Sequence, residues 1–267
     1  MPTASQPIRP TRPEAAIRLA GGSVALDPSP HEKRVGLLVL ATDHTSEADF
    51  RRMVASNRIG VHVARIAYAN PTTPENLRRM QPSLGQGADL ILPGERLDAL
   101  CYSCTSASVV IGDEAVEAAL SDAKPGAAIV TPPSAAAKGL AALGARTISI
   151  LTPYTVETSR PMADYFAALG FEIASFDCLG FEDDREMARI THASIVEAAV
   201  GATAPEAEAL FVSCTALRAA SVVPEIEQRI GRPVVTSNLA SAWACLRACG
   251  DTTARPERGQ LMGLGHA

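Results

Sequence analysis

The chain has 267 residues, of which 47% are hydrophobic and 20% are charged, and its formal net charge is -5 at pH 7. This apolar content excludes an intrinsically disordered chain, and the acidic balance excludes a general attraction to nucleic acid or to an anionic membrane. No apolar run approaches the roughly 18 residues of a membrane-spanning helix. Residues 1–13 lack the apolar core of a secretory signal, so we expect a cytoplasmic protein without nucleic-acid or membrane partners.

The predicted elements begin after an N-terminal arm. Residues 1–33 contain six prolines and show no apolar periodicity, which indicates irregular structure. From Arg34 onward, short apolar runs alternate with amphipathic stretches. That alternation is typical of strands and helices that build a parallel sheet.

The remainder of the chain contains an internal repeat. Both copies read as strand, polar turn and amphipathic helix, followed by further strands in the same order, at an offset of about 110 residues, near the usual size of a domain. The corresponding pairs are 35–53 with 147–166, 61–69 with 171–180, 97–112 with 208–223, and 127–144 with 232–250.

This repeat predicts an α/β fold of two pseudo-symmetric, doubly wound parallel-sheet lobes of the Rossmann-like type. We expect the first lobe over residues 34–145, the second over 146–250, and a C-terminal tail over 251–267, with C-terminal segments able to cross back to the first lobe. In open parallel sheets, ligands bind beyond the carboxyl ends of the strands. The active site is therefore expected in the cleft between the lobes.

The same short motif follows the third predicted strand of each copy: Ser103-Cys104-Thr105 in the first and Ser213-Cys214-Thr215 in the second. A single motif of this kind is more often a buried structural cysteine. At the start of a helix, however, backbone N–H groups and the helix dipole are expected to lower the pKa of a thiol. Two such thiols across a cleft can act as a base and an acid on opposite faces of a substrate.

Four stretches resemble one superfamily. They are residues 102–108 (Tyr-Ser-Cys-Thr-Ser-Ala-Ser), 211–215 (Phe-Val-Ser-Cys-Thr), 151–154 (Leu-Thr-Pro-Tyr) and 234–238 (Val-Val-Thr-Ser-Asn). They resemble the aspartate/glutamate racemase superfamily, and within it the branch of maleate cis-trans isomerase and arylmalonate decarboxylase. The similarity covers residues 34–250, and within the branch the pattern most resembles the ectoine-utilisation A proteins.

The resemblance implies a cofactor-independent enzyme in which Cys104 and Cys214 are the working thiols. Decarboxylases of the branch typically keep only the second cysteine, so two cysteines favour an isomerase, racemase or epimerase. The resemblance also implies that the Tyr154 hydroxyl donates to a substrate carboxylate. The other hydroxyl and amide groups expected to bind substrate are those of Thr105, Ser106, Thr215 and Asn238.

Two acidic residues depart from the pattern of the resembled branch. Where maleate isomerases read Ser-Asn-Thr-Thr after the first strand, this chain has Asp43 in place of the asparagine, and a second family asparagine aligns with Asp184. An ionised carboxylate repels a substrate carboxylate in a closed site but suits an ammonium group. We therefore predict that Asp43 and Asp184 bind an amino group. The alternative is that Asp43 caps the following helix and Asp184 lies on a solvated turn.

These observations predict a two-cysteine racemase, epimerase or isomerase of a small dicarboxylate or amino acid, such as aspartate or 3-hydroxyaspartate, in ectoine or hydroxyectoine breakdown. The alternatives are a maleate cis-trans isomerase that forms a covalent cysteine adduct, an arylmalonate-type decarboxylase, and a non-catalytic ligand-binding protein. No sequence has the spacing of metal ligands or of a phosphate-binding loop, so no metal and no cofactor are predicted. A homodimer is expected because it is the commonest soluble assembly.

Overall fold

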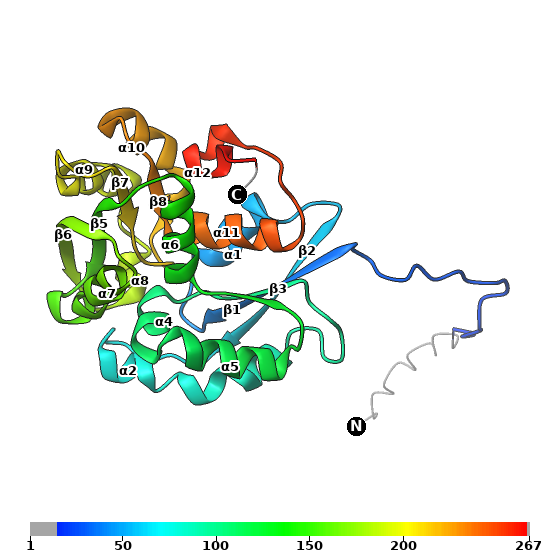
Figure 1. Ribbon diagram of the computed structural model, residues 1–267. Coiled ribbons are helices and arrows are strands. Elements are labelled where there is room, and N and C mark those ends of the chain that lie inside the picture. The colour runs from blue at the N-terminus through cyan, green and yellow to red at the C-terminus, as the bar shows by residue number, and fades with distance from the viewer. Residues whose placement is uncertain (1–14, 266–267) are drawn as a thin grey trace, which may run out of the picture. The chain divides into compact units, whose positions relative to one another are not determined.

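A computed structural model describes residues 15–265 of the chain (Figure 1). The chain divides into two units, with the boundary between Pro30 and His31. In the first unit, residues 15–30 form no helix or strand, and the side chains of Ile17, Leu19, Val24 and Leu26 are exposed. Across the described residues, no helix is both long enough and apolar enough to cross a membrane.

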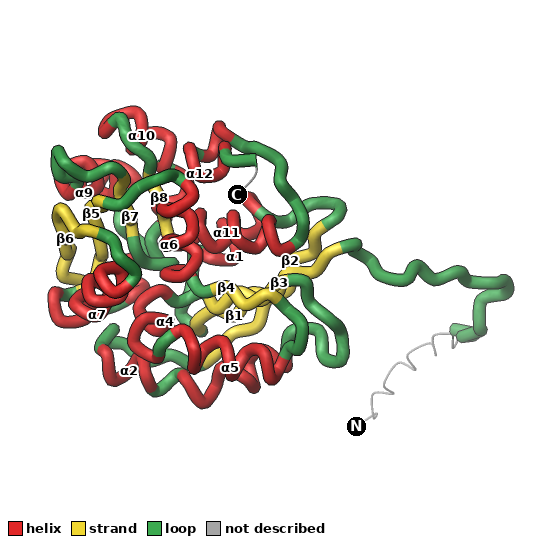
Figure 2. Tube along the Cα trace, in the orientation of Figure 1, coloured by secondary structure: helices red, strands yellow, loops and turns green. Residues whose placement is uncertain are grey.

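The second unit contains two parallel four-stranded sheets with the same strand order, β2-β1-β3-β4 and β6-β5-β7-β8 (Figure 2). This arrangement confirms the predicted α/β fold of two doubly wound sheets. The strands are β1 (Lys33–Leu40), β2 (Ile59–Ile66), β3 (Ala99–Tyr102), β4 (Ala128–Val130), β5 (Thr147–Tyr154), β6 (Glu172–Phe181), β7 (Ala209–Val212) and β8 (Val234–Thr236).

Helices connect the strands and flank both sheets. The α-helices are α1 (Ser46–Met53), α2 (Pro74–Arg78), α3 (Leu84–Asp89), α4 (Thr105–Ile111), α5 (Asp113–Ala123), α6 (Pro132–Ala142), α7 (Val156–Ala168), α8 (Asp184–Met187), α9 (His192–Ala202), α10 (Val223–Ile230), α11 (Ser237–Ala248) and α12 (Gln260–Gly263). Short 3₁₀ helices cover Gln81–Ser83, Arg218–Ser221 and Pro256–Arg258.

The central strands are buried because helices lie over the sheets. The last six residues of β1 and the last seven of β5 are buried, which explains the unbroken apolar sequence of β1 and the mainly apolar sequence of β5. Three helices that follow strands begin at a threonine whose hydroxyl accepts a backbone N–H, namely Thr131 before α6, Thr155 before α7 and Thr236 before α11. These caps fix the point at which each strand turns into a helix.

The two sheets share packing elements. Helix α11 follows β8 of the second sheet but packs against α1, α6, β3 and β4 of the first half of the chain. One hydrophobic core cluster contains side chains of both β1 and β5. The lobe boundary predicted at residues 145 and 146 falls in the connection between α6 and β5.

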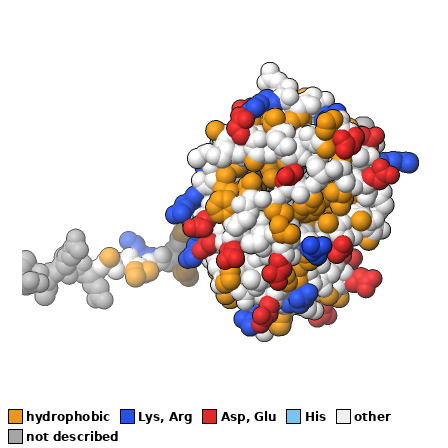
Figure 3. Space-filling view, turned by 90° about the vertical axis from the view of Figure 1, so that its left-hand side faces the viewer, with side chains coloured by type: hydrophobic (Ala, Val, Ile, Leu, Met, Phe, Trp, Pro, Cys, Tyr) orange, Lys and Arg blue, Asp and Glu red, His pale blue; other side chains and the backbone are white. Residues whose placement is uncertain are grey.

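Strand β6 lies at the edge of the second sheet. Its apolar side chains Ile173, Phe176, Leu179 and Phe181 are only partly buried. Figure 3 views the side of the molecule where β6 lies and shows hydrophobic side chains gathered between scattered acidic and basic groups. An edge strand with an apolar surface is the type of feature that proteins often cover with a partner.

Candidate active site

The two cysteine motifs meet at one cavity between the sheets. Cys104 follows β3 and precedes α4, and Cys214 follows β7 at the equivalent place in the second sheet. Both side chains line the same cavity although their exposed fractions are only 5% and 6%. The cavity has a volume of only about 20 Å³, which is room for about one water molecule.

Five of the seven predicted substrate-binding residues line this cavity together with the two cysteines. The lining residues come from both halves of the chain, and among those described there are two carboxylates and no lysine or arginine. They are Leu40, Asp43, Tyr68, Thr72, Leu77, Cys104, Ser106, Tyr154, Asp184, Met187, Cys214, Thr215 and Ala216.

The thiol pKa values contradict the sequence-based expectation. Burial raises the pKa of Cys104 to about 12, although the backbone N–H of Ala107 and the hydroxyl of Ser106 act in the opposite direction. Burial likewise raises the pKa of Cys214 to about 11, against the Tyr154 hydroxyl and the backbone N–H groups of Ala216 and Leu217. The expected lowering toward neutrality is wrong for the unliganded protein because desolvation outweighs the hydrogen bonds.

Tyr154 lies between the two cysteine segments. Its hydroxyl donates a hydrogen bond to the Cys214 thiol and contacts the Ser106 hydroxyl. The Ser106 oxygen lies 3.9 Å from the sulfur of Cys104. Burial raises the pKa of Tyr154 well above its usual value, so the phenol is a hydrogen-bond donor at neutral pH.

Asp43 holds the turn that leads into α1, whose N-cap residue is Thr45. One carboxylate oxygen accepts the backbone N–H groups of Thr45 and Ser46 at 3.0 and 2.9 Å, and the other accepts the Ser46 hydroxyl at 2.7 Å. Asp43 also lines the cavity, and burial raises its pKa. Both carboxylate oxygens of Asp43 are therefore used at the start of α1, an arrangement close to the capping alternative.

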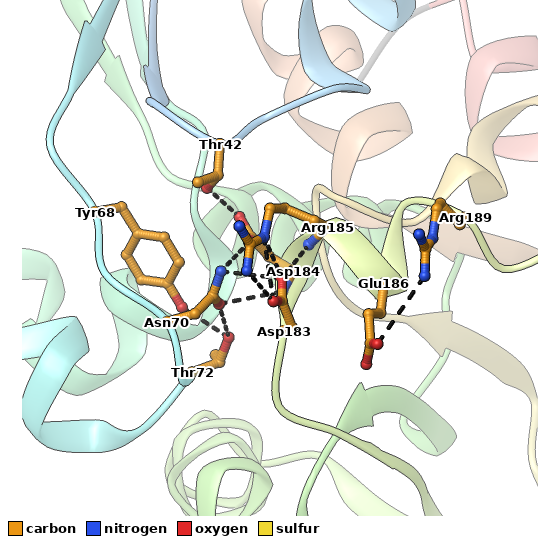
Figure 4. Close-up of polar contacts among 9 residues, drawn as sticks. All are labelled: Thr42, Tyr68, Asn70, Thr72, Asp183, Asp184, Arg185, Glu186 and Arg189. Atoms are coloured by element: carbon orange, nitrogen blue, oxygen red, sulfur yellow. Dashed lines mark hydrogen bonds and ion pairs between the residues drawn. The ribbon is translucent and has the colours of Figure 1, made fainter.

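Asp184 is buried at the start of α8 rather than on a solvated turn, so that alternative is wrong (Figure 4). Its carboxylate accepts hydrogen bonds from the Asn70 amide at 2.8 Å and from the Thr42 hydroxyl. Both donors are neutral and come from the first half of the chain. The nearby Arg185 guanidinium is turned to Asp183, with Nε to carboxylate oxygen distances of 2.9 and 3.1 Å.

Two predicted substrate-binding residues do not line the cavity. The Thr105 hydroxyl donates to the Ser237 oxygen at 2.8 Å, and the Asn238 amide donates to Asp49 at 2.7 Å and to the carbonyl of Thr215 at 3.0 Å. Both side chains are buried. The structure therefore gives them contacts with protein groups where the sequence indicated contacts with substrate.

Sequence reasoning missed the polar side chains that follow β2. Tyr68 and Thr72 line the cavity, and their hydroxyl oxygens are 2.7 Å apart. Burial raises the pKa of Tyr68, so it too is a donor at neutral pH. Their place just after a parallel strand was the signal that could have found them, because ligands bind at this edge.

The other four cysteines, Cys101, Cys178, Cys245 and Cys249, are free thiols that do not line the cavity. Within residues 15–265, no group of three or more His, Cys, Asp or Glu side chains is arranged to hold a metal ion. The chemistry available in the cavity is thus that of two thiols, two carboxylates, and hydroxyl and N–H donors.

Comparison with known proteins places this arrangement in a family. A sequence model described as arylmalonate decarboxylase matches residues 97–262. The chain is 33% identical to the arylmalonate decarboxylase of Bordetella bronchiseptica over 135 residues, which are 49% of this chain and 56% of that protein. It is 24% identical to the maleate isomerase of Geobacillus stearothermophilus over 244 residues, which are 86% of this chain and 96% of that protein.

A solved structure shows the same fold over nearly its whole length. It is a mutant of the Nocardia farcinica maleate cis-trans isomerase with a covalently bound succinylcysteine intermediate. The TM-score is 0.79 at 23% sequence identity, and the match covers 88% of this chain and 99% of that one. Since the family model spans more than half of the sequence, the chain belongs to the arylmalonate decarboxylase family, within the aspartate/glutamate racemase-like superfamily.

Proposed function

We propose that the protein is a cofactor-independent isomerase that acts on a small dicarboxylate through Cys104 and Cys214. The observation that carries this proposal is that two cysteines from equivalent strand ends line one buried cavity. The names of the relatives support it, because proteins called maleate isomerase match over 86% of this chain. In this proposal, one cysteine must be a thiolate and the other a thiol when substrate is bound.

The finer part of the proposal is that the substrate carries an amino group, as aspartate and 3-hydroxyaspartate do. Asp184 supports it, since this buried carboxylate faces the cavity with only neutral hydrogen-bond donors around it. An ammonium group would supply a positive charge in direct contact with this carboxylate. One thiolate would then remove the proton from the substrate carbon, and the other thiol would return a proton to the opposite face.

Maleate cis-trans isomerisation is the second candidate, and the comparisons favour it. A thiolate would add to one alkene carbon, and the electron pair of the double bond would move toward the adjacent carboxylate. Rotation about the resulting single bond and expulsion of the thiolate would restore the double bond in the other geometry. This route exchanges no carbon-bound hydrogen with solvent unless the intermediate is protonated at carbon.

Proton NMR in deuterated water, with aspartate, 3-hydroxyaspartate, maleate and phenylmalonate as substrates, tests these alternatives. Loss of the α-hydrogen signal of an amino acid supports proton transfer, conversion of maleate to fumarate supports the second candidate, and release of carbon dioxide from phenylmalonate supports a decarboxylase. Cys104→Ala and Cys214→Ala are each expected to lower kcat by about a thousandfold or more, as losses of groups that act directly on the substrate do. Full activity in both variants, or binding without turnover of any substrate, contradicts the proposal.

Asp184→Asn separates the two substrate classes. If Asp184 binds an ammonium group, this variant loses about tenfold or more of kcat/KM on the amino acid, because a charge-assisted contact becomes a neutral one. The same change is expected to leave kcat/KM for maleate unchanged or to increase it, since a repulsive charge is removed. A decrease of equal size for both substrates contradicts the assignment of Asp184 to the amino group.

We also propose a metabolic role and an oligomeric state. The resemblance to the ectoine-utilisation A proteins supports a role in ectoine or hydroxyectoine breakdown, in the cytoplasm. The partly exposed apolar side chains of β6 support a homodimer. Light scattering of the purified chain tests the dimer, because a monomer would have a mass of 27.9 kDa.

A further inference from the structure

The two cysteines differ in backbone conformation although their positions in the repeat are equivalent. Cys104 is extended, with a φ of -150°. Cys214 has a φ of +96°, in the region that residues with a side chain rarely adopt. A residue stays in such a conformation only where its surroundings hold it there, and such sites cluster where function demands a fixed geometry.

Hydrogen bonds from two other segments, the start of α11 and the residue before α1, hold the backbone around Cys214. The Cys214 N–H donates to the Ser237 oxygen at 3.0 Å, which fixes the strained residue itself. The next two carbonyls are also held, that of Thr215 by the Asn238 amide at 3.0 Å and that of Ala216 by the Thr45 hydroxyl at 2.7 Å. The Cys214 sulfur then accepts the N–H of Ala216 at 3.3 Å.

Ser237 also contacts the other cysteine segment. Its oxygen accepts the hydroxyl of Thr105, the residue after Cys104, at 2.8 Å. A second bond runs the opposite way, from the Thr215 hydroxyl to the carbonyl of Ser103 at 3.1 Å. These two bonds tie the segment of one thiol to the segment of the other.

The first copy of the repeat has no equivalent of this arrangement. The segment Thr236-Ser237-Asn238 corresponds to Thr131-Pro132-Pro133 in the first copy, and both begin with a threonine that caps a helix. Proline has neither a hydroxyl nor an amide side chain. Pro132 therefore cannot accept a hydrogen bond from the Cys104 N–H as Ser237 does from the Cys214 N–H. The Cys104 N–H instead bonds to the carbonyl of Tyr102 at 3.0 Å.

We propose that Ser237 is a positioning residue that holds Cys214 in its left-handed conformation and sets the placement of the Cys214 thiol relative to Cys104. A serine oxygen has two lone pairs, and here both are used, one for each cysteine segment. The proposal rests on the proposed two-cysteine function, because it concerns how the two reacting thiols are held in position relative to each other.

The test compares Ser237→Ala with Ser241→Ala in the full chain. Both serines lie on α11 and are buried, but the Ser241 hydroxyl has no hydrogen-bond partner among the described residues. Ser237→Ala is expected to lower kcat by about tenfold or more while KM changes by less than about threefold, because misplaced reacting groups cost rate more than binding. Ser241→Ala is expected to keep both constants within about twofold of the wild-type values, since it removes no contact to the site.

Alkylation of the thiols provides a readout that does not depend on turnover. With iodoacetamide at pH 9 and peptide mass spectrometry, Cys214 in Ser237→Ala is expected to react about threefold or more slowly, because the thiol moves away from its donors. Cys178, which lies outside the cavity and is half-buried, serves as the reference within each sample. Wild-type labelling of Cys214 in Ser237→Ala overturns the positioning role.

Failure of the proposed function is a separate outcome. If the wild-type chain turns over none of the dicarboxylates, the proposed function fails, and the labelling of Cys214 alone decides the role of Ser237. If Ser237→Ala does not fold, Thr105→Val removes the hydroxyl that donates to Ser237 and is expected to lower kcat by about threefold or more. An unchanged kcat in Thr105→Val then contradicts the proposal.

Discussion

At the scale of single residues, the hydrogen bond from the Tyr154 hydroxyl lowers the pKa of the Cys214 thiol. A donor stabilises the thiolate, whereas burial raises the pKa of Cys214 to about 11. Tyr154→Phe removes the donor without changing the shape of the ring, so it is expected to raise the pKa of Cys214 further. The rate of Cys214 alkylation at pH 9 should therefore fall by about tenfold, the equivalent of one pKa unit.

The pH profile and a second tyrosine serve as controls for this prediction. Because burial raises the pKa of Cys104 to about 12 and that of Cys214 to about 11, alkylation of both in the wild-type chain should rise about tenfold per unit between pH 7 and 9. Tyr165→Phe removes a hydroxyl that donates to Asp113 at 2.6 Å, outside the cavity, and should not alter this profile. A rate that levels off near pH 8 would contradict the raised pKa values.

The sequence predicted which residues line the cavity better than it predicted their properties. Cys104 and Cys214 follow strands, Tyr154 is the last residue of one, and the repeat made those strand ends recognisable. Their pKa values depend on desolvation by side chains from both halves of the chain, which no local pattern reports. For the same reason, the sequence could not show that Thr105 and Asn238 turn toward protein groups.

At the scale of elements, the start of α1 depends on Asp43. Its carboxylate accepts two backbone N–H groups and the Ser46 hydroxyl. Asp43→Ala is therefore expected to lower the free energy of unfolding by about 1–2 kcal/mol, as removal of a helix cap does. Asp43→Asn keeps one acceptor oxygen and should cost less than Asp43→Ala, as measured by urea denaturation.

The same pair of variants tests whether Asp43 binds an amino group. If Asp43 only holds the start of α1, the loss of stability should follow the number of acceptor oxygens removed. If Asp43 binds the ammonium group of a substrate, Asp43→Asn should raise KM for an amino acid by about tenfold. An increase in KM without loss of stability in Asp43→Asn would favour substrate binding over capping. Equal stability of the wild type and Asp43→Ala would contradict the capping role.

The sequence predicted the positions of strands correctly where a short apolar run marks the strand. The apolar run at 35–40 became the buried part of β1, and the strand predicted at 171–180 is β6, Glu172–Phe181. The strand predicted at 61–69 ends earlier, since β2 covers Ile59–Ile66 and the polar residues after it turn to the cavity. The specific packing of α11 on the first sheet depends on contacts between distant segments, which periodicity does not encode.

At the scale of the whole molecule, the two halves are joined over the cavity by the cluster of Thr42, Asn70 and Asp184 (Figure 4). The Asp184 N–H also donates to the Asn70 oxygen at 3.2 Å, so Asn70 is bound to Asp184 in both directions. Because the cavity has a volume of only about 20 Å³, a four-carbon dicarboxylate needs more room than it provides. We therefore expect residues that line the cavity to move when substrate binds.

Hydrogen exchange followed by mass spectrometry measures that movement. Ligand bound between the halves stabilises the closed arrangement by an amount that grows with its concentration over Kd, about 2.7 kcal/mol at a hundredfold excess. Amide exchange in residues 68–77 and 183–187 should therefore slow about tenfold or more with a saturating dicarboxylate in Cys214→Ala, which we expect to bind substrate without turnover. Asn70→Ala should accelerate exchange in the same segments without ligand, because it removes the bonds that join them to Asp184. Unchanged exchange in both experiments would mean that substrate reaches the thiols by another part of the cavity wall.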